Sequence, residues 1–129
     1  MTDVDGNVFL DFSAAFGVAV LGHAAPEVEV AVARQAGVLC HGMGDVHPPS
    51  VKVELAERLG RLFPGGGGKV LFGLSGSDAV EAAVKTAMVA TGRPGAIAFE
   101  GAYHGLSMGA LACTHRDDFR APFAERLAR

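Results

Sequence analysis

The stretch 69–81 joins a short apolar run to a helix through a loop of serine and glycine. The run at 70–74 has the length and composition of a strand that is buried on both faces. A helix is predicted over 79–91, with Asp78 as its N-cap and Glu81 completing a capping box. This order of elements constrains the fold more than any other feature of the chain.

The junction between this strand and this helix contains Ser75, Gly76 and Ser77. Unpaired backbone N–H groups and the positive end of the helix dipole converge there, so a phosphate would fit. Gly76 lets the backbone approach a ligand closely, and the two serine hydroxyls can donate to phosphate oxygens. An ordinary strand-to-helix turn is also commonly written with serine and glycine, so these residues alone leave both interpretations open.

Charge and composition restrict the partners. The 129 residues are half hydrophobic and amount to about one small domain. The net charge of −3, with basic and acidic residues interspersed, provides no basic stripe and argues against a nucleic-acid partner. Neither secretion nor a membrane partner is indicated, since no leader-like start and no stretch of about 18 apolar residues occurs. Cys40 and Cys113 are isolated from each other, which favours a reducing compartment, and we expect a cytoplasmic protein.

The chain before the junction predicts a turn, a strand and two helices. Asp5-Gly6-Asn7 favours a turn, and the residues 8–12 alternate as a strand does. One helix is predicted from Pro26 to Leu39 and a second, more amphipathic one over 50–63. The apolar face of the first contains Val28, Ala31, Val32 and Leu39 beside Gln35, and the second is expected to bury Val51, Leu55, Leu59 and Leu62.

A second strand is expected at 96–100, followed by a loop at 101–105. The apolar segment after it, 106–113, is compatible with either a helix or a strand. Two buried strands separated by a helix form a right-handed βαβ unit, whose loops lie at the carboxyl end of the sheet, where ligands bind. Tyr103 and His104 would then lie beside the predicted phosphate site, which favours a ligand with a flat ring and a phosphate.

The sequence also contains partial patterns of two other kinds of site. The glycine run before Lys69 is not a nucleotide-binding P-loop, because Val70 follows where serine or threonine is required. Four residues of metal-binding type occur within eight positions: Cys40, His41, Asp45 and His47. Their loop is rich in glycine and proline and has no regular ligand spacing, so a polar loop is favoured and no metal site is predicted.

Four segments together match a known pattern. They are DGNVFLDF at 5–12 with GV and LGH in 17–23 and Pro26, LAERL at 55–59 with Pro64, SGSDAVEAAVK at 75–85, and FEGAYHG at 99–105. In this order and spacing, the chain resembles class III (omega-type) aminotransferases, which use pyridoxal phosphate and have the fold type I architecture. The resemblance runs nearly end to end.

The resemblance implies an α/β fold: residues 48–129 would begin the mainly parallel, pyridoxal phosphate-binding large domain, and residues 1–47 would be a small-domain segment. It also implies transfer of an amino group from an amine or omega-amino acid to a keto acid, in a homodimer. Gly76 and Ser77 would hold the cofactor phosphate beside Ser75, through backbone N–H groups and hydroxyl. Tyr103 would stack on the pyridine ring, and His104 would shape that loop.

No catalytic residue is assigned. The family's Schiff-base lysine is expected beyond Arg129, whereas Lys52, Lys69 and Lys85 occupy other positions. We therefore expect an aminotransferase fragment that does not turn over alone. Two alternatives stay open: a non-catalytic remnant that binds a phosphorylated ligand or pairs with a full-length subunit, and the unfolded product of a decayed gene.

Overall fold

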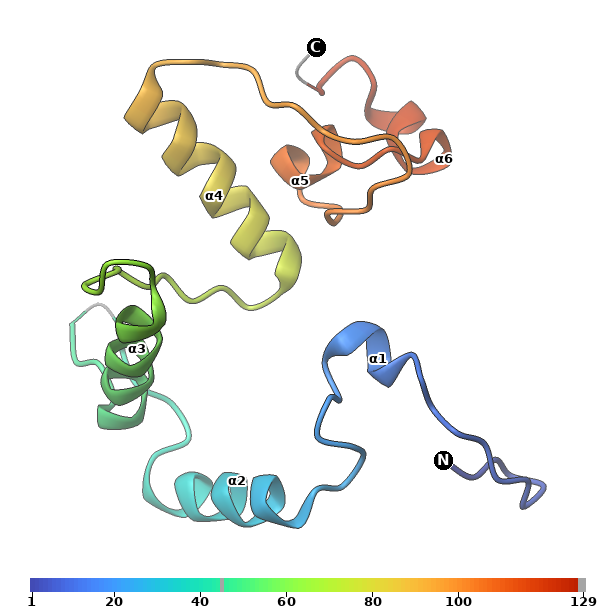
Figure 1. Cartoon of the computed structure of the whole chain (residues 1–129), viewed down its shortest axis with the longest axis vertical. Coiled ribbons are helices and arrows are strands. Elements are labelled where there is room, and N and C mark those ends of the chain that lie inside the picture. Colours follow the sequence, from blue (N-terminus) through green and yellow to red (C-terminus); the bar gives the residue numbers. More distant parts are fainter. Residues whose placement is uncertain (45, 128–129) are drawn as a thin grey trace. The chain divides into compact units, whose positions relative to one another are not determined.

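The computed structural model describes residues 1–44 and 46–127 (Figure 1). The chain divides into two compact units, Met1–Leu55 and the part from Ala56 onward. In order, the elements are α1 (Ala14–Gly17), α2 (Pro26–Val38), α3 (Ser50–Leu62), α4 (Gly76–Thr91), α5 (Met108–Ala112), α6 (Asp117–Arg120) and the 3-10 turn η1 (Ala121–Phe123). In the described part of the chain, none of these helices is long and apolar enough to cross a membrane. The domain boundary expected after residue 47 stays a prediction.

The first unit begins with the predicted turn. The Asp3 carboxylate accepts hydrogen bonds from the backbone N–H groups of Asp5 and Asn7, at 3.0 and 2.9 Å. Thr2 and Val8 pair across the turn in an antiparallel bridge. The turn is confirmed, but the strand expected over 8–12 is represented by this single bridge.

Asp11 organises the segment that precedes α2. One carboxylate oxygen accepts from the backbone N–H groups of Ser13 and Ala14, both at 3.0 Å, and the other lies 2.8 Å from His23 Nε2. These contacts, that with His23 above all, hold the pKa of Asp11 well below its ordinary value. The intervening α1 is irregular, because Ala14, Ala15 and Phe16 have φ of 44°, 50° and 59°, in the left-handed region that costs non-glycine residues energy.

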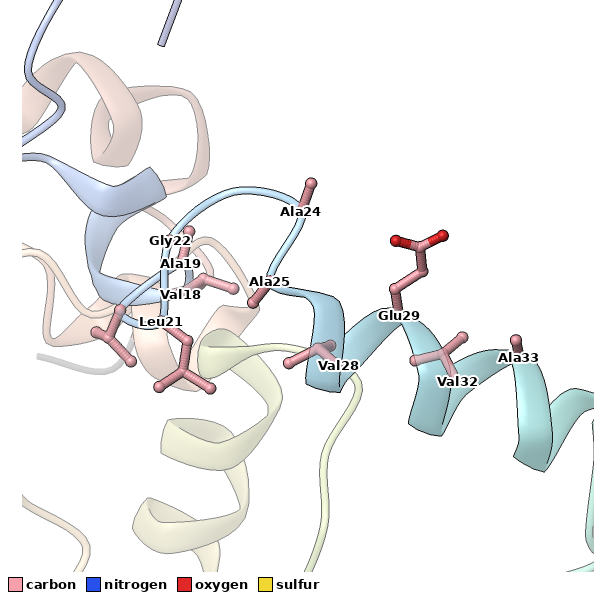
Figure 2. A pocket seen from close by; sticks show the side chains of 11 residues that line it. Val18, Ala19, Leu21, Gly22, Ala24, Ala25, Val28, Glu29, Val32 and Ala33 are labelled. Carbon is pink, nitrogen blue, oxygen red and sulfur yellow. The ribbon is translucent and has the colours of Figure 1, made fainter.

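Helix α2 confirms the prediction that Pro26 starts a helix, since proline fits the first turn without losing a hydrogen bond. Its N-terminal half and the preceding segment line an open apolar groove of about 580 Å³ (Figure 2). Leu21, Val28 and Val32 contribute to the lining. The predicted apolar face is present but not buried, since Val28 is 45% and Val32 62% exposed.

Helix α3 is also where the sequence predicts it. The expected burial of its apolar residues is wrong: Leu59 is 41% and Leu62 80% exposed, and Val51 and Leu55 are likewise exposed. Amphipathic periodicity predicts which side of a helix is apolar, but burial also needs a second surface to cover that side. Among the described residues, no element covers these four side chains completely.

The second unit is built around α4 and α5, which pack against each other, with α5 also contacting α6. Helix α4 ends as predicted at Gly92, whose φ of 67° provides a left-handed C-cap. The ambiguous apolar segment is resolved as the short helix α5. Ala110 and Leu111 on α5 are buried, and so is Thr114, which is only 1% exposed.

The expected parallel sheet is not confirmed. The segments 70–74 and 96–100 form no β-ladder, and within the described ranges the bridge near the N-terminus is the only strand pairing. Leu74 and Ile97, expected in strands buried on both faces, are 99% and 95% exposed. A strand requires a partner for its backbone hydrogen bonds and a covering layer for its side chains. The helical half of the predicted α/β pattern is observed, and the sheet stays a prediction.

Candidate functional site

The N-terminus of α4 is held by a reciprocal pair of side-chain contacts. Ser75 is the N-cap, and its hydroxyl accepts a hydrogen bond from the backbone N–H of Asp78 at 3.1 Å. The Asp78 carboxylate accepts from the backbone N–H of Leu74 at 3.2 Å. The predicted cap at Asp78 is therefore wrong by three residues. Ser75 is the N-cap because Ser75 and Asp78 form a reciprocal pair similar to a capping box. The Glu81 carboxylate instead binds Gly109 and Lys85.

Two backbone donors at this helix end have no partner. Among the described residues, no acceptor lies within hydrogen-bond reach of the N–H groups of Gly76 and Ser77. A Cβ built on Gly76 would meet nothing within 4 Å, so space is open on the side of Gly76 where a side chain would lie. Free N–H groups and the positive end of the α4 dipole make this position suitable for an anion.

The hydroxyl of Ser77 joins α4 to the segment 105–107. It accepts hydrogen bonds from the backbone N–H groups of Leu106 and Ser107, at 3.1 and 2.9 Å. It also lies 2.9 Å from the Ser107 hydroxyl. These bonds use the full hydrogen-bonding capacity of one hydroxyl. The predicted contact from this hydroxyl to a phosphate would replace one of them, whereas the Ser77 backbone N–H is free for that purpose.

Gly105 makes this junction possible. Its φ is +122°, and a methyl group at its Cα would lie 2.6 Å from Ser77 Cβ. No other residue type fits without moving the backbone of α4 or of the loop. The structure therefore brings Gly105, the end of the segment 101–105, against the start of α4, as expected from the βαβ interpretation, although by direct contact and without a sheet.

Tyr103 and His104, the two aromatic residues of this loop, are held by contacts with residues that follow them in the chain. Tyr103 packs edge-on against Phe119, with ring centroids 5.9 Å apart and an interplanar angle of 64°. Tyr103 remains 58% exposed, which leaves ring surface available to a ligand. The backbone N–H of His104 donates to the hydroxyl of Thr114 at 3.0 Å. Both predicted site residues thus lie on a loop that is fixed to the C-terminal part of the unit.

Glu81 forms a second link between α4 and α5. One carboxylate oxygen accepts from the backbone N–H of Gly109 at 2.6 Å, and the other pairs with Lys85 Nζ at 3.1 Å. The hydrogen bond from Lys85, helped by Ser107 and Gly109, holds the pKa of Glu81 below its ordinary value. The capping-box role that the sequence predicted for Glu81 is therefore wrong, and the contact with Gly109, 28 residues away, gives no local signal.

The described residues were predicted to contain no metal site, and their metal-binding side chains are not clustered. In the ranges 1–44 and 46–127, no three histidine, cysteine, aspartate or glutamate side chains are arranged to hold a metal ion. Of the four metal-capable residues noted in the sequence, Asp45 lies outside the described residues. Lys85 is paired with Glu81, and Lys69 is exposed.

Comparison with known proteins identifies the family. The family model described as Aminotransferase class-III matches residues 1–129. The chain belongs to the class III aminotransferase family, as the four sequence segments indicated.

Individual relatives support this assignment. The chain is 44% identical over 110 residues to an alanine/serine racemase of Pyrococcus horikoshii, covering 85% of this chain and 23% of that protein. It is 45% identical over 113 residues to a 5-aminovalerate aminotransferase of Pseudomonas aeruginosa, covering 87% and 26%. It is 40% identical over 121 residues to an acetylornithine aminotransferase of Methanopyrus kandleri, covering 94% and 31%. The chain spans between a fifth and a third of the length of these relatives.

Proposed function

We propose that this chain is the phosphate-binding part of a pyridoxal phosphate-dependent aminotransferase. The observation that carries the proposal is the α4 N-terminus, where the N–H groups of Gly76 and Ser77 have no partner among the described residues and Ser77 contacts Gly105 at the end of the Tyr103 loop. An anion fits this position on charge and on hydrogen bonding. Membership of the class III family supports pyridoxal phosphate as the cofactor.

Each residue has a role that follows from its contacts. The backbone N–H groups of Gly76 and Ser77 donate to the phosphate, and Ser75 keeps the first turn of α4 intact through its bond to Asp78. Tyr103 offers its exposed ring to the pyridine, and His104 fixes the loop through its backbone. When bound, pyridoxal phosphate supplies an electron sink for negative charge at the carbon that carries the amino group.

The reaction of the whole protein is amino-group transfer from an amine or omega-amino acid to a keto acid. The names of two relatives, 5-aminovalerate and acetylornithine aminotransferases, support this substrate class. The name of the remaining relative, an alanine/serine racemase, favours a second candidate, racemisation of a small amino acid. We further propose a cytoplasmic homodimer. Residues 1–129 alone bind the cofactor without turnover, because the resemblance to class III aminotransferases matches the Schiff-base lysine to none of Lys52, Lys69 and Lys85.

Ligand titration of residues 1–129 tests the binding. Tyr103 is the only tyrosine and the chain has no tryptophan, so intrinsic emission reports on the proposed ring contact directly. Pyridoxine 5′-phosphate is the suitable probe, since it has the ring and the phosphate but no aldehyde to react with lysines. We expect saturable quenching, weaker quenching by pyridoxine, and competition by inorganic phosphate. Absence of quenching by pyridoxine 5′-phosphate would refute the proposed phosphate site.

Activity of the complete gene product tests the reaction. With pyridoxal phosphate, it should convert 5-aminovalerate and a keto acid to 5-oxopentanoate and the amino acid that corresponds to the keto acid, whereas a racemase would interconvert the enantiomers of alanine without a keto acid. Cofactor binding with neither activity would favour the non-catalytic remnant. Turnover by residues 1–129 alone would contradict the proposed lack of a catalytic lysine.

A further inference from the structure

Thr114 contacts the loop that contains Tyr103 and His104. It is 1% exposed, and its hydroxyl makes three contacts. The hydroxyl oxygen accepts from the His104 backbone N–H at 3.0 Å, and the hydroxyl faces the carbonyl oxygens of Gly105 and Ala110 at 3.0 and 3.2 Å. One buried side chain thus joins two consecutive loop residues to α5.

Each of these loop residues has its own link to the candidate site. Gly105 lies against Ser77 at the start of α4, and the residue before His104 is Tyr103. The backbone of Ala102 is fixed as well, because its carbonyl accepts from the N–H of His115 at 2.8 Å. The segment 102–105 is therefore held at both ends, by the backbone at one end and by the Thr114 hydroxyl at the other.

We propose that Thr114 is a positioning residue for the cofactor site, which sets the loop so that Tyr103 and the start of α4 receive the ring and the phosphate of one ligand together. This inference rests on the proposed function. Without the hydroxyl, the His104 N–H and the Gly105 carbonyl lose a buried partner, and the loop exchanges among arrangements. Only the fraction of molecules with the loop in place then binds tightly.

Thr114→Val tests this with little change in side-chain volume, and Thr114→Ser restores the hydroxyl. Thr91→Val is the matched control: the Thr91 hydroxyl also donates to a carbonyl four residues earlier, Ala87 at 2.7 Å, and accepts a backbone N–H, Arg93 at 3.2 Å. Thr91 lies at the opposite end of α4 from the site.

Two readouts are needed. In the ligand-free chain, hydrogen exchange of the His104 amide should accelerate about tenfold in Thr114→Val and stay at the original rate in Thr114→Ser and Thr91→Val. With pyridoxine 5′-phosphate, the Kd from Tyr103 quenching should rise about tenfold in Thr114→Val only. Far-UV circular dichroism should show unchanged helix content in all variants.

The outcomes separate the two proposals. If Thr114→Val exchanges and binds as the original chain does, or if Thr114→Ser is as impaired as Thr114→Val, the inference is overturned. If Thr114→Val does not fold, Thr114→Ser decides, since slow His104 exchange and tight binding are then still required. If the original chain does not quench at all, the proposed cofactor site is wrong. Thr114 is then judged on His104 exchange, which must be slow in the original chain and fast without the hydroxyl.

Discussion

Gly105 and Ser77 are in such close contact that a methyl group on Gly105 would lie 2.9 Å from Ser77 Cα. Gly105→Ala should therefore push the loop away from α4, and the φ of +122° adds backbone strain. We expect a loss of about 1–3 kcal/mol in the free energy of unfolding of the second unit. Urea denaturation followed by Tyr103 emission measures it. Gly95→Ala, which meets nothing within 4 Å, is the control, and equal unfolding free energies for the two variants would contradict the contact.

Gly76→Pro should remove one phosphate donor without disturbing α4. Gly76 is the first residue of the helix, where proline is well tolerated. The preceding Ser75 has φ −153° and ψ 166°, an extended conformation that a following proline favours. We expect unchanged helix content by circular dichroism and quenching by pyridoxine 5′-phosphate that is weaker by about tenfold, as for a lost charge-assisted hydrogen bond. Gly76→Ala keeps the N–H and should bind normally; equal affinity of the proline variant would place the phosphate elsewhere.

Ser75→Ala should weaken α4 from its N-terminus. The variant loses the hydroxyl that accepts from the Asp78 N–H, at a cost of about 1 kcal/mol. Ser75→Asp keeps an acceptor and adds a negative charge near the helix dipole, so it should retain stability. Thermal unfolding monitored by circular dichroism compares the three chains. Equal unfolding midpoints for the original chain and Ser75→Ala would indicate that Asp78, and not Ser75, is the N-cap.

The link between α4 and α5 should depend on pH through Glu81. Its pKa is lowered in the folded chain, chiefly by Lys85, so the ionised carboxylate contributes stability above the ordinary glutamate pKa. That contribution is lost as the pH falls from the ordinary value toward the lowered one. The Glu81 carboxyl carbon shift in NMR should titrate below the ordinary range, and Lys85→Met should move its midpoint upward. Glu81→Gln should flatten the acid dependence of unfolding in this unit. A midpoint unaffected by Lys85→Met would assign the shift to another group.

The sequence predicted the three long helices because their boundaries are local. Pro26 starts α2, Gly92 ends α4, and the spacing of apolar residues marks α3. The N-cap of α4 was missed because Ser75 and Asp78 each begin a possible capping box. Only the contact between Glu81 and the distant Gly109 shows that Glu81 does not complete a box with Asp78. Burial and strand pairing depend on surfaces that lie far away in the sequence, so periodicity could not establish them.

The residues of the candidate site likewise divide into those that the local sequence indicates and those that only the fold reveals. Ser75, Gly76 and Ser77 could be proposed as an anion-binding junction because a helix start exposes its own N–H groups. That the Tyr103 loop lies against this junction was expected from chain topology and from the family resemblance. Thr114 could not be found, because a threonine after an apolar segment reads as an ordinary helix end, and only the fold shows its hydroxyl turned back onto His104.

The bond between the hydroxyls of Ser77 and Ser107 spans 30 residues, whereas the cap of α4 spans three. During folding, α4 can form from local interactions, but its link to the loop must first close a long stretch of chain, much of it already helical. In the proposed site, the N–H groups of Gly76 and Ser77 are therefore arranged before the loop that contains Tyr103 is in place. On this proposal, a chain interrupted at this stage would offer those N–H groups to any small anion, and a preference for a ligand with a ring would require the contact between Ser77 and Ser107.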